Sequence, residues 1–428
     1  MKKFFISRRH FLKALPLSIL ATLSFKGASA ASLPIKVTVS KKSASTLTFS
    51  ISSTLSGKFY LEYGATATQV TSKSSISTVT AGKAKIIQIS GLQPNSTIYY
   101  RVRYLLGKSK NYQATQVASA TTDQILSQST FAVQADPHMD YNSSEEVYLG
   151  TLKQVVAAAP AFLMDLGDIF MVDKLQDKSE ANIRGRFELM KGYYAKLGNV
   201  PLKITLGNHD GELGYSKFNT KNYRREYFPE QTGELAYFAF TGPDQLHVVL
   251  DPFTYTVENP KDDGWQWTLG KTQYDWLVKT LQESTAPHKF IYIHHLLVGN
   301  AQSRGGVEIA HLNEWGGKSN DGSYGFDQFR PGWGKPIHQL LLENKVGFVF
   351  KGHDHLYVKQ ELDGIIYQTL PQPSHPGDKI DVKQYGYFSG KGVGGSGFLK
   401  VRTEGSTAFV DFIKHDGAVA DSYSRTAL

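Results

Sequence analysis

Short apolar runs alternate with longer amphipathic stretches over residues 123–428. Each run has the length and composition of a buried strand. The stretch that follows the first run has helical features: Glu145 and Glu146 lie in its first turn, and Pro160 stops it. Strands are predicted over 130–135, 161–164, 201–206, 247–250, 290–293 and 346–350, helices over 144–159, 180–197, 272–283 and 336–344, and further strands over 357–413.

This alternation predicts an α/β domain whose sheets are covered by helices. Polar segments follow five of the predicted strands. In such sheets ligands bind at the carboxyl ends of the strands, so we expect these segments to lie together. They are Asp136-Pro137-His138, Gly167-Asp168, Gly207-Asn208-His209-Asp210, His294-His295 and Gly352-His353-Asp354-His355.

Residues 31–122 have a different pattern, rich in Ser and Thr and poor in helix signals. Alternating segments at 47–51, 58–63 and 85–89, separated by glycine-containing turns, predict a β-sandwich. The segment 90–102, with Leu92 and Pro94 before a Tyr-rich strand, resembles the fibronectin type III signature. Such a module either binds substrate or supports the catalytic domain, and we favour support. Residues Ala118 to Gln128 are the predicted linker.

The first thirty residues predict an export signal. Arg8-Arg9 with Phe11-Leu12-Lys13 precedes an apolar run and the small residues Ala28-Ser29-Ala30, a pattern that resembles a twin-arginine signal peptide. The alternative is an uncleaved anchor, but the run from Ala14 to Phe25 is shorter than the ~20 residues that span a bilayer. We therefore expect a periplasmic or secreted protein without a membrane span after signal removal.

Charge and cysteine content narrow the function. The whole chain carries a formal net charge of +9, and removal of the six basic residues of 1–30 lowers it to +3, which gives no reason to expect nucleic-acid binding. The chain has no cysteine, which excludes disulfides and thiolate ligands. Histidine, carboxylate and amide ligands suit Zn, Fe, Mn or Mg.

The five segments contain the ligands of a two-metal site. Two ions held ~3.5–4 Å apart need a bridging ligand, and the carboxylate of Asp168 suits this role. Asp136 and His138 lie two residues apart, a spacing that places both side chains on the same side of an extended segment. His353 and His355 repeat this spacing, so each can reach a different ion. Of the remaining residues, Asn208 adds a neutral oxygen and His294 completes the second site.

In their order and positions, these segments resemble the calcineurin-like metallophosphoesterase superfamily, which includes the purple acid phosphatases. With the fibronectin-like module in front, the layout resembles that of plant-type purple acid phosphatases. The match runs from Asp136 to His355. The resemblance implies an α/β domain with a β-sandwich core flanked by helices (αββα). It also implies two divalent or trivalent ions, Fe, Zn or Mn.

The resemblance also implies a role for each site residue. His209 would donate a proton or hydrogen bond to the leaving oxygen, while a metal-bound hydroxide attacks phosphorus. Asp136, His138 and His355 would bind the first metal, Asp168 would bridge, and Asn208, His294 and His353 would bind the second.

The chain departs from the family at Met171. Purple acid phosphatases carry a tyrosine there, so an Fe(III)–tyrosinate site is not expected. Many relatives carry an aspartate there that orients the proton-donating histidine, and Asp173 or Asp210 is the expected substitute. We therefore expect Asp210 and His209 to be the catalytic residues.

Three further features concern the surroundings of the site. His295 contacts substrate, supports a ligand or caps its loop, whereas Asp165 is expected to be structural. The Gly-rich insertion 299–334 is either a lid over the site or a loop packed by its own aromatic residues. We expect substrate choice to reside in it, with Arg304 as the residue that grips phosphate.

These observations predict an exported phosphoesterase acting on a small-molecule phosphate ester, with phosphomonoesters favoured. A nucleotidase, a cyclic-nucleotide phosphodiesterase or another phosphodiesterase on the same site is the enzymatic alternative. A cell-surface binding protein with a vestigial metal site is the alternative of a different class.

Overall fold

The computed structural model describes residues 34–42, 45–122, 128–210, 223–228, 235–255, 264–298, 304–378 and 380–427. The predicted signal peptide, residues 1–30, lies outside the described residues. The chain divides into two compact units, Met1–Ile125 and Leu126–Leu428. Each unit is described by itself.

The first unit is all-β, with two sheets. One has the order β1-β2-β6, and the other has the order β4-β3-β7-β8, with β5 and β9 pairing to β3 and β7. In β2, Leu47, Phe49 and Ile51 alternate with less buried residues and enter the core. The strands are β1 (Ile35–Lys42), β2 (Thr46–Ser53), β3 (Gly57–Gly64), β4 (Ser72–Lys73), β5 (Ser77–Val79), β6 (Lys85–Ser90), β7 (Thr97–Leu106), β8 (Gln113–Ala114) and β9 (Ala118–Thr121).

Two larger sheets form the second unit. The first has the order β12-β11-β10-β22-β23-β24, and β10, β11 and β12 run parallel. Its strands are β10 (Ser129–Gln134), β11 (Leu163–Asp165), β12 (Leu202–Ile204), β22 (Gly397–Glu404), β23 (Thr407–Lys414) and β24 (Val419–Thr426).

The second sheet has the order β13-β14-β17-β18-β20-β19-β21, and its neighbours from β14 to β20 run parallel. Its strands are β13 (Phe238–Gly242), β14 (Gln245–Val249), β17 (His288–Ile293), β18 (Phe348–Lys351), β19 (Tyr357–Leu362), β20 (Ile365–Thr369) and β21 (Lys391–Val393). A separate ribbon pairs β15 (Thr254–Tyr255) with β16 (Trp267–Thr268).

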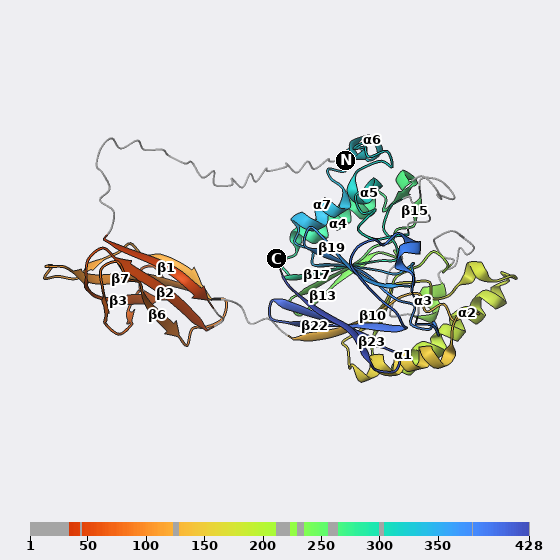
Figure 1. The fold of residues 1–428 in the computed structure, drawn as a ribbon, viewed down its shortest axis with the longest axis horizontal. Helices are drawn as coiled ribbons and strands as arrows, with labels where there is room; N and C mark the ends of the chain where they lie inside the picture. Colours follow the sequence, from red (N-terminus) through yellow and green to blue (C-terminus); the bar gives the residue numbers. More distant parts are fainter. Residues whose placement is uncertain are drawn as a thin grey trace, which may run out of the picture. The chain divides into compact units, whose positions relative to one another are not determined.

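The two sheets pack face to face over an aromatic core. Phe131 of β10 meets Phe290 of β17 with ring centroids 5.0 Å apart. Helices cover the outer faces: α1 and α2 lie on the side of the first sheet, and α4 and α7 on the side of the second (Figure 1). The helices are α1 (Glu145–Ala157), α2 (Glu180–Tyr194), α3 (Tyr223–Tyr227), α4 (Lys271–Glu283), α5 (Asn313–Gly316), α6 (Phe326–Phe329) and α7 (Ile337–Glu343), with 3-10 turns η1 (Val172–Lys174), η2 (Ala195–Leu197), η3 (Gly264–Gln266) and η4 (Val382–Tyr385).

This is the αββα architecture expected from the sequence, preceded by an all-β unit. One boundary differs: residues 118–121 of the predicted linker form β9, which pairs with β7 and so belongs to the first unit. Helix α1 begins as predicted, because Ser144 accepts a hydrogen bond from the backbone N–H of Val147 and caps it. None of the helices that the structure describes has the length and apolar character required to cross a membrane.

Candidate metal centre

The predicted ligands lie just beyond the carboxyl ends of five parallel strands. Asp136 and His138 follow β10, Asp168 follows β11, and Asn208 follows β12. From the second sheet, His294 follows β17, and His353 and His355 follow β18. Because the strand ends of both sheets meet here, segments separated by more than two hundred residues form one site.

Glycines allow these loops to touch. A Cβ atom on Gly167 would lie 2.3 Å from the backbone nitrogen of Gly207, and a Cβ on Gly207 would lie 2.1 Å from the backbone nitrogen of Asp168. A Cβ on Gly352 would lie 2.7 Å from Oδ2 of Asp136. The glycines that precede Asp168, Asn208 and His353 therefore permit a close approach that no other residue allows.

The backbone of the ligand loops differs from the sequence-based expectation. The spacing of Asp136 and His138 predicts an extended segment, but both residues have left-handed backbones, with φ of 58° and 52°. His353 and His355 have φ of 72° and 59°. The paired side chains converge through consecutive tight turns instead of strand alternation, and this strained geometry is concentrated at the ligands.

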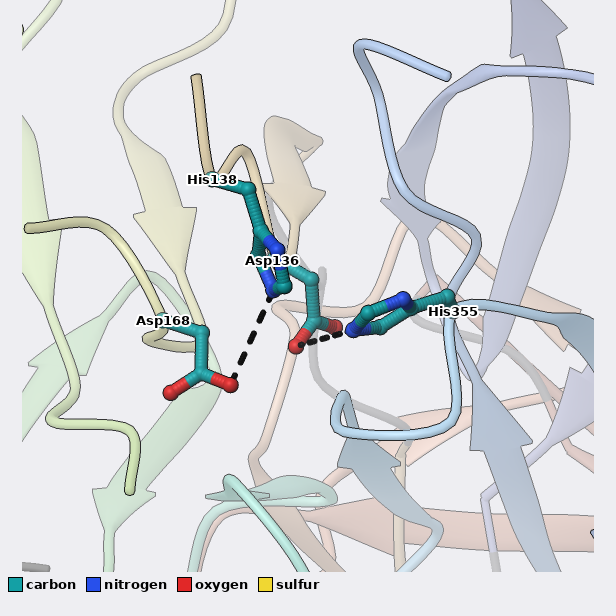
Figure 2. Close-up of side chains that lie close together, drawn as sticks. All are labelled: Asp136, His138, Asp168 and His355. Atoms are coloured by element: carbon teal, nitrogen blue, oxygen red, sulfur yellow. Dashed lines mark ion pairs between the residues drawn. The ribbon is translucent and has the colours of Figure 1, made fainter. Parts of the chain in front are cut away.

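The first cluster contains Asp136, His138, Asp168 and His355, with one ligand atom from each lying within 4.8 Å of the others. Nε2 of His355 is 3.6 Å from Oδ1 of Asp136, and Nε2 of His138 is 3.8 Å from Oδ2 of Asp168. Figure 2 shows the four side chains converging, Asp136 and His138 from one loop and Asp168 and His355 from two others. His138 Nε2 is buried and makes no hydrogen bond within the described residues. A buried imidazole nitrogen that lies beside a carboxylate without a hydrogen bond is suited to a cation.

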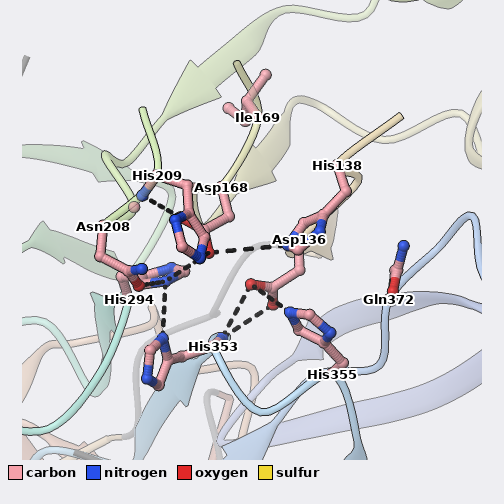
Figure 3. Close-up of polar contacts among 12 residues, drawn as sticks. Asp136, His138, Asp168, Ile169, Asn208, His209, His294, His353, His355 and Gln372 are labelled. Atoms are coloured by element: carbon pink, nitrogen blue, oxygen red, sulfur yellow. Dashed lines mark hydrogen bonds and ion pairs between the residues drawn. The ribbon is translucent and has the colours of Figure 1, made fainter. Parts of the chain in front are cut away.

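The second cluster contains Asp168, His294 and His353, so Asp168 belongs to both clusters. His294 Nδ1 lies 2.8 Å from the carbonyl of Leu166, which can only accept, so Nδ1 carries the proton. The lone pair of Nε2 then faces Oδ1 of Asn208 at 3.0 Å and Oδ2 of Asp168 at 3.4 Å (Figure 3). Three acceptors that converge on one point require a cation between them. The residues therefore fit a metal ion in each cluster.

The charges of the cluster support the same conclusion. Burial alone would raise the pKa of Asp168, but the charges of His294 and His209 outweigh it and hold that pKa well below its usual value. Burial likewise opposes a charge on His294, yet the attraction of Asp168 raises the pKa of His294 to about 9. In this arrangement the buried carboxylate of Asp168 is stabilised by positive charge, which protons supply when metal ions do not.

Two residues that the sequence analysis did not single out hold the loop that carries Asp136 and His138. Oδ2 of Asp140 lies 3.4 Å from Nδ1 of His138 and orients the ring, a common arrangement for metal-binding imidazoles. The half-buried guanidinium of Arg186, on α2, donates to the carbonyls of His138, Met139 and Phe170 and so joins two ligand loops. Asp140 was detectable as a carboxylate two residues from a ligand, whereas no local signal connects α2 to the site.

Asp173 orients His209. Nδ1 of His209 lies 2.7 Å from Oδ2 of Asp173, and the backbone N–H of His209 donates to Asp168 at 2.8 Å. Asp210 has a different part: its buried carboxylate accepts from the backbone N–H groups of Asp168, Ile169, Phe170 and Gly207. The expectation of a catalytic Asp210 is corrected accordingly, because its oxygens are engaged in fixing the loops around the bridging carboxylate.

His295 does not line the site. Its ring has no exposed surface and lies against Trp267, Phe253 and His353, with centroids 4.6, 5.2 and 5.2 Å away. Burial lowers the pKa of His295 to about 3. The expectation that His295 contacts substrate is therefore corrected: it supports His353 from behind.

The described part of the insertion, 304–334, is held by contacts within itself and with the neighbouring elements. Buried Arg330 pairs with Glu314, and Nε1 of Trp315 donates to the hydroxyl of Tyr367 at 2.9 Å. Arg304 is the predicted substrate residue that reaches the ligand loops: its Nη1 is 3.3 Å from Oδ1 of Asp354 and from the carbonyl of His353. Its side chain is 31% exposed, which leaves the guanidinium accessible beside the site.

Comparison with solved structures finds similar but distant folds. The yellow lupin (Lupinus luteus) purple acid phosphatase PPD1 is 13% identical, with a TM-score of 0.47 over 92% of this chain and 74% of that one. A structure of PhoD is 12% identical, with a TM-score of 0.45 over 91% and 88% of the two chains. A Danio rerio dimetal phosphatase is 12% identical, with a TM-score of 0.45 over 70% and 99%. Comparison with curated protein sequences gave no match.

The sequence model of the calcineurin-like phosphoesterase family matches residues 129–357, more than half of the chain. The matched residues begin at β10 and end at the start of β19, so they contain both clusters and His209. The chain belongs to the calcineurin-like phosphoesterase family and is a metal-dependent hydrolase of phosphoric esters.

Proposed function

We propose that this protein is an exported phosphoesterase with a two-metal centre, and that it cleaves small-molecule phosphate esters outside the cytoplasm. The position of Asp168 in both ligand clusters carries the proposal, because a two-ion centre needs such a bridge. The twin-arginine pattern at Arg8-Arg9 supports export to the periplasm or medium. The ligand types suit Fe, Zn or Mn.

The two ions divide the ligands between them. Asp136, His138 and His355 would hold the first ion, Asn208, His294 and His353 the second, and Asp168 both. When bound, such ions activate a water molecule as nucleophile and offset the charge on the phosphate oxygens.

His209 is the proposed proton donor. Asp173 fixes the ring through Nδ1, which turns Nε2 toward the site, 4.0 Å from Oδ2 of Asp168. A proton held at Nε2 would pass to the oxygen of the departing alcohol. Arg304, beside the His353 loop, would contact a phosphate oxygen.

Phosphomonoesters are the favoured substrates. Nucleotides are the second candidate, together with cyclic nucleotides and other phosphodiesters on the same site. We propose a small-molecule ester as the partner and expect no nucleic acid, given the charge of +3 without residues 1–30.

Hydrolysis of p-nitrophenyl phosphate by Mn- or Zn-loaded protein tests the proposal. Asp168→Ala and Asn208→Ala should abolish turnover, whereas Asp177→Ala and Asn199→Ala, at exposed positions outside both clusters, should leave it unchanged. If metal-loaded wild type is no more active than the Asp168 variant across a broad panel of esters, the protein is instead a binding protein with a vestigial site.

A further inference from the structure

A cavity of about 220 Å³ adjoins the metal centre on the side of His355. Its walls come from the segment after β20, from η4 and from the turn before β22, and none of these lies in the insertion between His294 and His353. The cavity is lined by Asp354, His355, Leu356, Gln372, His375, Gly377, Ile380, Asp381, Gln384, Tyr385, Gly395 and Ser396.

One wall of the cavity is hydrogen-bonded to the loop that carries Asp136 and His138. Ser374 Oγ donates to the carbonyl of Pro137 at 2.7 Å, and the backbone N–H of Ser144 donates to the carbonyl of Ser374 at 2.8 Å. Gln372 is 3% exposed, and its amide donates to Ser143 and Ser374. The cavity is thus fixed relative to Asp136 and His138 before any ligand arrives.

The carboxylate of Asp354 at the floor is engaged by its neighbours. The buried carboxylate of Asp354 accepts from Lys351 at 2.7 Å, from the Tyr387 hydroxyl at 2.5 Å and from the backbone of Gly305 at 3.1 Å. Arg304 pairs with the same carboxylate, and its guanidinium lies 5.0 Å from the ring centroid of Tyr385. With Lys351 and Arg304 both against it, the Asp354 carboxylate presents no unpaired negative charge to a ligand.

The remaining lining favours a neutral, hydrogen-bonding ligand. Gln372, Gln384, Tyr385 and His375 supply amide, phenol and imidazole groups, and none of the described lining residues is a lysine or arginine. A second phosphate would find no lysine or arginine among the described lining residues and would lie near Asp381. Hydroxyl groups would find both donors and acceptors.

The cavity and His209 lie at different ends of the centre. His209 contacts Asp168 and Asp173, whereas the cavity is lined by His355 and by neither Asp168 nor His209. Figure 3 shows His209 and Gln372 at opposite ends of the labelled cluster. If His209 protonates the departing alcohol, a group in the cavity is the substituent that stays on phosphorus.

We propose that this cavity binds the retained alcohol of a phosphodiester, a small neutral group rich in hydroxyls such as a polyol or a sugar unit. The inference rests on the proposed function. Water adds its oxygen to phosphorus, the bond from phosphorus to the departing oxygen breaks, and His209 donates the proton that this alcohol needs. The proton lost by the attacking water replaces the one that His209 gave up. The products are the phosphomonoester of the retained alcohol and the free second alcohol.

The test compares three esters with p-nitrophenol as the leaving group: glyceryl p-nitrophenyl phosphate, methyl p-nitrophenyl phosphate and p-nitrophenyl phosphate. Metal-loaded wild type should prefer the glyceryl over the methyl diester in kcat/KM by about tenfold, the effect of one or two hydrogen bonds, and mainly through KM. Gln384→Trp, at an exposed position on η4, should fill the cavity and remove the preference while monoester hydrolysis stays unchanged.

Gln384→Lys is the second variant, and Gln328→Lys, an exposed glutamine on α6 outside the cavity lining, is its matched control. The Gln384→Lys variant should shift the preference toward a retained group that carries a carboxylate, glycerate in place of glycerol, and the Gln328→Lys control should not. Binding of glycerol phosphate, the expected product, should weaken in Gln384→Trp by isothermal calorimetry.

Cleavage of the monoester without any preference between the diesters would overturn the inference and leave the proposed function standing. An equal loss of monoester and diester turnover in both Gln384 variants would also overturn it. Failure of the metal-loaded wild type to cleave any of the three esters would contradict the proposed function itself.

Discussion

Replacing Asp173 with asparagine should slow the enzyme most on esters with poor leaving groups. Oδ2 of Asp173 is 2.7 Å from Nδ1 of His209, and the two side chains are 13% and 19% exposed, so water screens the contact only weakly. A hydrogen bond to a charged group contributes about 1.5–3 kcal/mol. At about 1.4 kcal/mol for each factor of ten, its loss predicts a fall in kcat of roughly 10- to 150-fold for alkyl phosphates.

The assay compares kcat for an alkyl phosphate and for p-nitrophenyl phosphate. p-Nitrophenol departs as an anion and needs little help from an acid, so its kcat should fall much less, and KM for both should stay near the wild-type value. Asp177→Asn, which changes an exposed carboxylate outside the site, serves as the control. Equal losses for the two esters would refute the reasoning, because they would mean that Asp173 holds the structure of the site and not the proton donor.

Three further predictions concern the supports of the site. Asp140→Asn should weaken metal affinity about 10- to 100-fold, measured by competition with a chelator, because the carboxylate 3.4 Å from Nδ1 orients His138; unchanged affinity would contradict this. Gly207→Ala should lower the free energy of unfolding by roughly 1–3 kcal/mol in urea, because its Cβ would lie 2.1 Å from the backbone of Asp168, whereas Gly192→Ala, with open space around it on α2, should be neutral or stabilising. Burial raises the pKa of Asp165 to about 7, so the folded state holds a proton that the unfolded chain releases near its ordinary pKa, and this contribution to stability is lost as pH rises toward 7. In the metal-free Asp165→Asn variant, the free energy of unfolding should therefore depend less steeply on pH, by up to about 1.4 kcal/mol per pH unit, and an unchanged slope would disprove the assignment.

The sequence predicted the strands well because strand signals are local. Runs such as 290–293 have no polar residue, and a buried strand is the simplest structure that hides them. A parallel strand then determines where its next residue lies, at the shared carboxyl edge. The order of the five segments was therefore enough to bring Asp136 and His355 together.

Contacts between distant segments were not readable in the same way. Arg186 reaches the ligand loops from α2, and Gln372 lines the cavity from a loop with no motif. The choice between Asp173 and Asp210 as partner of His209 depended on the path of η1, since both carboxylates are close in sequence to the site. The left-handed backbone at Asp136 and His138 was also missed, because neither residue type demands it.

A crystal structure of the Mn-loaded protein, with anomalous scattering used to locate the ions, tests the two-metal centre most directly. The account predicts two peaks ~3.5–4 Å apart, with the carboxylate of Asp168 coordinating both and Asn208 coordinating only the second. A single peak, or two peaks of which neither is bound by Asp168, would contradict it.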